Sequence, residues 1–470
     1  MKLNSAKIQV DLTDALERHR VAGASIAILH EGALAMAAAG YANISTGVGL
    51  TTDTMMHIGS ITKVLNATLV MQLVDEGLLD LEVPVSQYLP DFRVKDPSAT
   101  EEITVKMLIN HTSGIDGDTT IDHGHDEETV EKAVARMSTY SQIFPPGADC
   151  SYSNAATVVA GHLAARVTGV SWYELIKNRI FKPLNMRCSV VLPEDALLAR
   201  ASMGHFLDWQ TNRHIRSSHA FLPLGFAPAG HTAMMSPSDL VIFAQMHLSN
   251  GLGPDGSPML SAESARLMRE TTTPGIGRMP YGVGLGWMTY GNGVVGHGGG
   301  GPGVVGRLYA SPRHQFAIAI LTNSDNGDSL IEDFAAPYLQ EVCGFEIPHS
   351  SASDVLPNAT IDNANYVGCF EDSWMSYTIA EKSDGLVLST RTKIAIYDVI
   401  STEPTDSAVM LPVGDDQFVV KPTDQQRNAN REAFPQAGDV LITFRNKDSL
   451  GRPQHLASGS RLYRRAGEQL

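Results

Sequence analysis

The chain has 470 residues, of which 43% are hydrophobic and 18% are charged, a balance typical of globular rather than disordered proteins. A chain of this length is too long to fold around one ordinary hydrophobic core, which predicts two or three domains. The formal net charge is −16 without any basic run, which argues against sequence-independent nucleic-acid binding and against docking to anionic membranes.

The four cysteines are widely spaced and form no Cys-x-x-Cys pair. This pattern predicts reduced, buried thiols rather than a disulfide framework or a zinc ribbon. The first residues lack the apolar core of a secretory signal, and no apolar stretch is long enough to span a bilayer. We therefore expect a cytoplasmic protein.

The first part of the chain predicts a sheet that is covered by helices. Residues 6–19 have apolar positions at helical spacing and predict an amphipathic helix. Residues 24–29 and 34–38 predict two strands around a tight turn. An apolar run over 64–74 then predicts a helix that begins near Ser60.

Helical patterns dominate from about residue 104 to residue 200, which predicts a mostly helical insert. Helices are expected over 127–139 and 155–168, and Ser171 is a plausible N-cap for a third. Pro145-Pro146-Gly147 breaks the chain before Tyr152-Ser153-Asn154, so these side chains are expected on a loop.

Strands return after a helix start at Ser236-Pro237. Four are expected, separated by glycine-rich turns, over 284–288, 294–297, 303–309 and 316–323. The last is a continuous apolar run, which fits a central strand that is buried on both faces. Residues 332–343 predict a closing helix.

The C-terminal part predicts a second domain. Residues 349–356 form a polar linker, and short strand-like runs recur beyond it over 366–370, 377–380, 386–389, 417–420 and 440–444. This spacing indicates a small antiparallel β-barrel. We therefore expect a catalytic domain over 1–348 and a barrel domain over 357–470.

The strongest chemical signal is the pair Ser60 and Lys63. Residues three apart share one face of a helix, and a serine near a helix start lies among unpaired backbone N–H groups. A neighbouring ammonium that can give up its proton would activate the hydroxyl as a nucleophile. Ser60 as a simple N-cap beside a solvated lysine is the structural alternative.

Two further motifs suit the same acyl-transfer chemistry: Tyr152-Ser153-Asn154, and His297 followed by Gly298, Gly299 and Gly300. The order of the three motifs, with the phrase His111-Thr112-Ser113-Gly114, resembles the serine β-lactamase and penicillin-binding-protein superfamily in its class C-like branch. This branch includes serine esterases, D-aminopeptidases and DD-peptidases. The resemblance covers roughly residues 15–345.

The resemblance implies a role for each residue. Ser60 would be acylated, neutral Lys63 would accept its proton, and Tyr152 would carry the proton to the leaving group and then help to activate water. Asn154 would donate to Lys63 or to a substrate carbonyl. The N–H groups of Ser60 and Gly300 would form the oxyanion hole, and the glycines would let backbone approach substrate closely.

His297 stands where the superfamily usually has the lysine of Lys-Thr-Gly. Histidine removes a permanent positive charge that could bind a substrate carboxylate, which favours neutral esters or amine-bearing peptides. A purely structural histidine is the alternative. Asp122-His123-Gly124-His125-Asp126 looks like a metal cluster, but we interpret it as an acidic loop without metal.

The resemblance implies an α/β (α+β) fold of the β-lactamase/transpeptidase type, with a lipocalin-like C-terminal barrel. The leading function is a serine hydrolase that forms an acyl-enzyme on Ser60, most simply a carboxylesterase acting on a small ester or amide. A D-aminopeptidase or DD-peptidase, a β-lactamase, an acyltransferase and an inactive binding or sensor protein are the alternatives. No cofactor or metal is expected, and homo-oligomer formation is left open.

Overall fold

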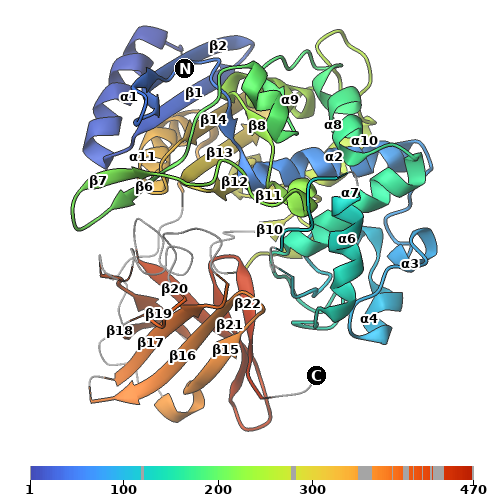
Figure 1. The fold of residues 1–470 in the computed structure, drawn as a ribbon, viewed down its shortest axis with the longest axis vertical. Helices are drawn as coiled ribbons and strands as arrows, with labels where there is room; N and C mark the ends of the chain where they lie inside the picture. The colour runs from blue at the N-terminus through green and yellow to red at the C-terminus, as the bar shows by residue number, and fades with distance from the viewer. Residues whose placement is uncertain are drawn as a thin grey trace.

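A computed structural model (Figure 1) describes most of the chain. The described residues are 2–117, 121–126, 128–276, 282–347, 362–383, 385–394, 402–405, 407–414, 416–423, 426 and 439–467. The linker that the sequence predicts over 349–356 lies outside these residues, so the proposed domain limits stay predictions.

A nine-stranded antiparallel sheet organises the first part of the molecule. The strand order is β3-β2-β1-β14-β13-β12-β11-β10-β9, so strands from both ends of this part pair at its centre. The strands are β1 Gly23–His30, β2 Ala33–Asn43, β3 Val48–Gly49, β9 Thr273–Pro274, β10 Gly282–Val283, β11 Met288–Thr289, β12 Val295–Gly301, β13 Val304–Ser311 and β14 Phe316–Thr322.

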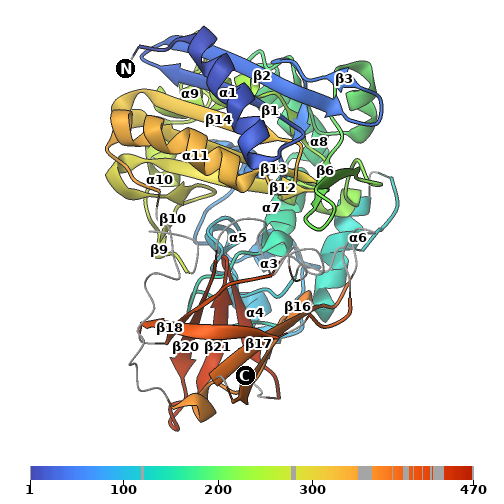
Figure 2. The same cartoon turned by 90° about the vertical axis from the view of Figure 1, so that its left-hand side faces the viewer.

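Strand β14 is buried along its whole length, which confirms the predicted central strand. Its side chains alternate between two hydrophobic cores because successive residues of a strand point to opposite faces. Ile318 and Ile320 pack in the core beneath α1 Ser5–His19 and α11 Asp328–Tyr338. Ala317 and Ala319 pack in the core that holds α2 Thr62–Asp75 and α9 Pro237–Leu248. Figure 2 shows α1 and α11 side by side over one face of the sheet.

The predicted helical insert is present beside α2. Its helices are α3 Val85–Tyr88, α4 Pro97–Glu102, α5 Val105–Ile109, α6 Thr129–Arg136, α7 Asn154–Thr168 and α8 Trp172–Ile176. Ser171 caps α8 by accepting a hydrogen bond from the Glu174 N–H, as predicted. A later helix, α10 Ala262–Met268, also contacts α2.

Two sequence predictions in this part are wrong. The strand expected over 284–288 is mostly a turn between β10 and β11, closed by a hydrogen bond from Gly284 N to Trp287 O. Gly286 has φ +81° there, a conformation that favours glycine. The glycines expected in a turn after His297 instead continue strand β12.

The C-terminal part is a closed antiparallel barrel, which confirms the predicted architecture. Its strands are β15 Gly368–Glu371, β16 Met375–Lys382, β17 Gly385–Thr392, β18 Ala408–Gly414, β19 Gln417–Val420, β20 Val440–Lys447, β21 Pro453–Ser458 and β22 Arg461–Arg465. Strands β15 and β22 pair and close it. Phe370, Phe418 and Phe444 pack in its core. Its likeness to lipocalins stays a prediction.

The barrel lies beside the helical insert (Figure 2). Apolar and polar side chains join the two parts. Ala457 and Leu462 of the barrel join Ile143, Phe144 and Ile276 in one buried cluster. Around it, the Arg445 guanidinium lies 3.3 Å from the carboxylate of Asp149. The two parts therefore share a packed interface. Within the described parts of the chain, every helix is too short or too polar to cross a lipid bilayer.

Candidate active site

Ser60 lies in a single 3-10 turn, η1 Gly59–Ile61, directly before α2. The prediction that it stands near a helix start is therefore confirmed. Gly59 has φ +51°, and a Cβ added there would lie 2.3 Å from the carbonyl oxygen of Gly300. Only glycine allows strand β12 to approach the turn this closely.

Lys63, one turn along, is buried and points its ammonium at three oxygen atoms. Its Nζ lies 3.0 Å from Ser60 Oγ, and it donates to Asn154 Oδ1 and to the carbonyl of Ala229, each at 2.6 Å. Three acceptors fix the nitrogen in place beside the hydroxyl. The structure thus brings together Ser60, Lys63 and Asn154 from separate parts of the chain.

Asn154 corrects two expectations. Ser153, not Asn154, ends the loop, because the Ser153 hydroxyl accepts from Ala156 N and caps α7, whose first residue is Asn154. The Asn154 side chain also accepts from Lys63 through its oxygen, which contradicts the predicted donation to Lys63, whereas donation to a substrate carbonyl stays a prediction. A cationic nitrogen has only hydrogen-bond donors, so it selects the amide oxygen.

Tyr152 lies on the loop before α7, as predicted, and it is held by the barrel. Its backbone N–H donates to the carbonyl of Ser460, in the hairpin between β21 and β22, at 2.9 Å. The Lys63 ammonium lies 4.7 Å from the centre of the Tyr152 ring, and the Arg461 guanidinium of β22 lies 5.1 Å from it. Two cations therefore contact the face of this aromatic ring.

His111 is a neighbour that the sequence did not single out as functional. Its ring centre lies 4.5 Å from that of Tyr152, and its Nδ1 accepts from the Ser153 N–H at 3.3 Å. Burial holds the pKa of His111 well below its ordinary value, and the positive charges of Lys63 and Arg461 lower it further. His111 is therefore a neutral support for the tyrosine loop.

His297 lies on β12, buried, with its ring centre 6.2 Å from that of Tyr152. Its Nδ1 donates to the carbonyl of Gly298 at 2.5 Å, which leaves Nε2 as the acceptor nitrogen. Among the described residues Nε2 has no hydrogen-bond partner. Burial, and then the charge of Lys63, lowers the pKa of His297 to about 3, so this position carries no positive charge at neutral pH.

The glycines after His297 bring β12 against the nucleophile turn. A Cβ added to Gly299 would lie 1.9 Å from the carbonyl oxygen of Ile58 and 3.0 Å from Ser60 N. A Cβ on Gly298 would meet the guanidinium of Arg307. Gly300 contacts Gly59, which places the two predicted oxyanion donors, Ser60 N and Gly300 N, on adjoining segments. Their oxyanion role stays a prediction.

The acidic loop over 122–126 leads into α6, and its last residue is bonded to that helix. Asp126 accepts from the hydroxyl of Thr129 at the start of α6 and pairs with Lys132 at 2.6 Å. In the part of the chain that the structure describes, no group of His, Cys, Asp or Glu side chains is arranged to hold a metal ion. All four cysteines are free thiols.

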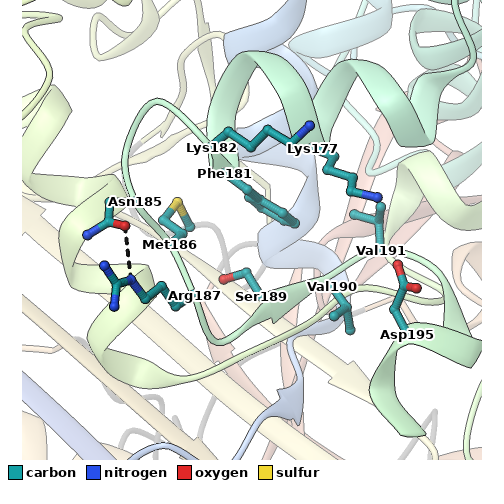
Figure 3. Close-up of a pocket in the computed structure, with 10 residues that line it drawn as sticks. All are labelled: Lys177, Phe181, Lys182, Asn185, Met186, Arg187, Ser189, Val190, Val191 and Asp195. Carbon is teal, nitrogen blue, oxygen red and sulfur yellow. Dashed lines mark hydrogen bonds between the residues drawn. The ribbon is translucent and has the colours of Figure 1, made fainter. Parts of the chain in front are cut away.

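The structure also holds a cavity of about 320 Å³ (Figure 3). Its lining combines apolar side chains with lysine, arginine and aspartate side chains. None of the predicted site residues lines it. Its lining is Lys177, Phe181, Lys182, Asn185, Met186, Arg187, Ser189, Val190, Val191 and Asp195.

Comparison with known proteins agrees with this fold and arrangement. Residues 10–339 match the family model described as Beta-lactamase. The chain is 36% identical over 365 residues to "Penicillin-binding protein 4" of Amycolatopsis lactamdurans, which covers 76% of this chain and 95% of that protein. The chain therefore belongs to the Beta-lactamase family, and the predicted resemblance is confirmed.

Two solved structures are similar over most of their lengths. The crystal structure of SurE with D-Leu is 25% identical, with a TM-score of 0.72 over 98% of this chain and 99% of that one. The D-amino acid amidase from Ochrobactrum anthropi SV3, complexed with L-phenylalanine amide, is 25% identical, with a TM-score of 0.59 over 71% of this chain and 95% of that one. The match to SurE therefore includes the barrel. The match to the amidase covers about as much of the chain as the predicted catalytic domain, residues 1–348.

Proposed function

We propose that this protein hydrolyses small esters and amides through an acyl-enzyme on Ser60. The observation that carries the proposal is the placement of Lys63 Nζ, 3.0 Å from Ser60 Oγ and fixed by Asn154 and Ala229. In the neutral amine, two N–H bonds stay on those two acceptors and the lone pair faces the serine hydroxyl. The amine can then accept the hydroxyl proton as the oxygen attacks a carbonyl carbon.

Tyr152 is the proposed proton carrier to the leaving group. Its ring contacts Lys63, and the cations on its face stabilise the phenolate form. Proton delivery breaks the bond to the leaving alcohol or amine and leaves the acyl group on Ser60. Water then attacks the acyl carbon and gives a proton to the phenolate. The Lys63 ammonium returns its proton to the serine oxygen as the acid leaves, which restores all three groups.

Esters are the first substrate class. An ester releases an alcohol that needs less protonation help than an amine, and His297 supplies no fixed positive charge to hold a substrate carboxylate. An aminopeptidase would need acidic groups to hold a substrate ammonium. The Arg461 guanidinium over the Tyr152 ring adds positive charge there, which disfavours every substrate that carries an ammonium.

A second candidate is hydrolysis of D-amino acid amides. It is favoured by the similarity to a D-amino acid amidase and to a protein that was solved with D-Leu. The fold and the serine-hydrolase family are common to both candidates. Only the acyl group and the leaving group differ.

One experiment separates the candidates. The protein is incubated with p-nitrophenyl esters, D- and L-amino acid amides and a chromogenic cephalosporin, and acylated Ser60 is sought by intact mass. We expect ester turnover with a transient adduct that Ser60→Ala abolishes. Turnover of D-amides above esters would favour the second candidate. No turnover and no adduct would refute the proposal.

A further inference from the structure

Three backbone segments that carry proposed reacting groups meet at one side chain, His57. This residue ends the two-residue strand β4 Met56–His57 and is 4% exposed. The first segment is the Ser60 turn. The second contains Ala229, whose carbonyl accepts from Lys63, and the third is the glycine edge of β12.

The imidazole of His57 bonds the first two segments through different nitrogens. Its Nδ1 accepts from the N–H of Gly59 at 3.3 Å, next to Ser60. Its Nε2 lies 2.8 Å from the carbonyl of His231, two residues after Ala229. One nitrogen must accept and the other must donate, so only the neutral Nε2–H tautomer satisfies both bonds.

The same ring packs on the third segment. A Cβ added to Gly301 would lie 2.7 Å from His57 Nδ1. Beside this contact, a Cβ on Gly230, which has φ +117°, would lie 2.2 Å from the carbonyl oxygen of Gly59. The Ser60 turn and the 229–231 segment are therefore packed backbone to backbone, and the His57 imidazole contacts all three segments.

We propose that His57 is a positioning residue that sets Ser60 relative to Lys63 and to the N–H of Gly300. The inference rests on the proposed acyl-enzyme function. His57 does not touch the reacting atoms, and it acts by fixing the Gly59 N–H and the 229–231 segment. A displacement of about 1 Å at such a site lowers turnover by about 100-fold.

The test compares three variants in the full chain. His57→Leu removes both hydrogen bonds while keeping an apolar group of similar size. His57→Asn keeps an acceptor near the position of Nδ1. His247→Leu is the matched control, because His247 is also fully buried but lies on α9, bonded to Thr68.

Two readouts are measured: the rate of acylation by a p-nitrophenyl ester, with kcat and KM separated, and hydrogen exchange of peptides that cover residues 56–64. We expect His57→Leu to acylate about 100-fold more slowly with KM within about threefold, and to exchange faster over 56–64. His57→Asn should recover at least about tenfold over His57→Leu. The control should change neither readout by more than about threefold.

The inference is overturned if the acylation rate of His57→Leu is within about threefold of the wild-type rate. It is also overturned if the control, His247→Leu, loses as much acylation rate as His57→Leu. If the wild-type protein itself forms no adduct, the proposed function fails and the exchange readout decides alone. Faster exchange over 56–64 in His57→Leu but not in the control then supports the positioning role of His57, and unchanged exchange overturns it.

Discussion

Asn154→Asp tests whether Lys63 acts as the base. The substitution places a carboxylate where the amide oxygen now accepts from Lys63 Nζ at 2.6 Å. A carboxylate stabilises the ammonium form, so Lys63 loses its proton only at higher pH. The volume of the side chain is almost unchanged, which separates the effect of charge from that of packing.

The size of the effect follows from the geometry. At 2.6 Å, two unit charges attract by about 6 kcal/mol at an effective dielectric constant of about 20, and desolvation of the new carboxylate offsets part of this. Opposite charges at this range shift a titration by about one to three pH units, equivalent to about 1.4–4 kcal/mol. We therefore expect kcat/KM for an ester at pH 7 to fall about 10- to 1,000-fold.

The assay is the pH profile of kcat/KM with a p-nitrophenyl ester. The acid limb should move upward by about one to three pH units, and activity should recover as pH rises through the shifted limb. Asn154→Ala is the control, because it removes the acceptor without adding charge and should lower the rate without an upward shift. An unshifted limb in Asn154→Asp would refute Lys63 as the base.

Three further outcomes are expected. Tyr152→Phe should lower kcat by about 100- to 10,000-fold and leave the fold intact by circular dichroism, and a loss below tenfold would contradict its role in proton transfer. Burial lowers the pKa of His247 to about 3, so below the ordinary pKa of 6.5 the unfolded chain binds a proton that the folded chain does not. The free energy of unfolding should therefore fall as pH falls, by about 1.4 kcal/mol per pH unit for this residue. Urea unfolding of His247→Asn between pH 6 and 5 should show a smaller change of this free energy with pH than the wild type shows. Leu462→Asp puts a carboxylate into the buried interface cluster and should lower turnover at least about tenfold, while Leu450→Asp, at a barrel position that is 70% exposed, should not.

The residues of the short motifs could be predicted from the sequence because their chemistry is local. Ser60 and Lys63 lie one helical turn apart, so their contact follows from helix geometry. The central strand β14 was predictable because an apolar run without alternation requires burial on both faces. The barrel was predictable from the regular spacing of its strands. The sequence did not predict β18, β21 or β22 as strands. Strand β22 carries three arginines and β21 begins with proline, and both features weaken the strand pattern.

The partners of these residues could not be predicted in the same way. Ala229 and Ser460 act through backbone carbonyls, which every residue has, so no side-chain pattern identifies them. His111 stands in the phrase His111-Thr112-Ser113-Gly114 and His57 precedes Ser60 by three residues, but their roles depend on segments more than 40 residues away in the chain. Only the folded chain shows which carbonyls and N–H groups face these side chains.

The position of Tyr152 explains how the barrel can influence the chemistry of the other domain. The Tyr152 N–H bonds to Ser460, and the hydroxyl of the preceding Ser151 accepts from the N–H of Leu462 at 3.0 Å. The tyrosine loop is thus hydrogen-bonded to both sides of Arg461, whose guanidinium lies over the Tyr152 ring. Since His297 is neutral, Lys63 and a barrel residue supply the positive charges around this ring. A change in the hairpin between β21 and β22 would therefore alter both the placement of the proposed proton carrier and the charge that acts on it.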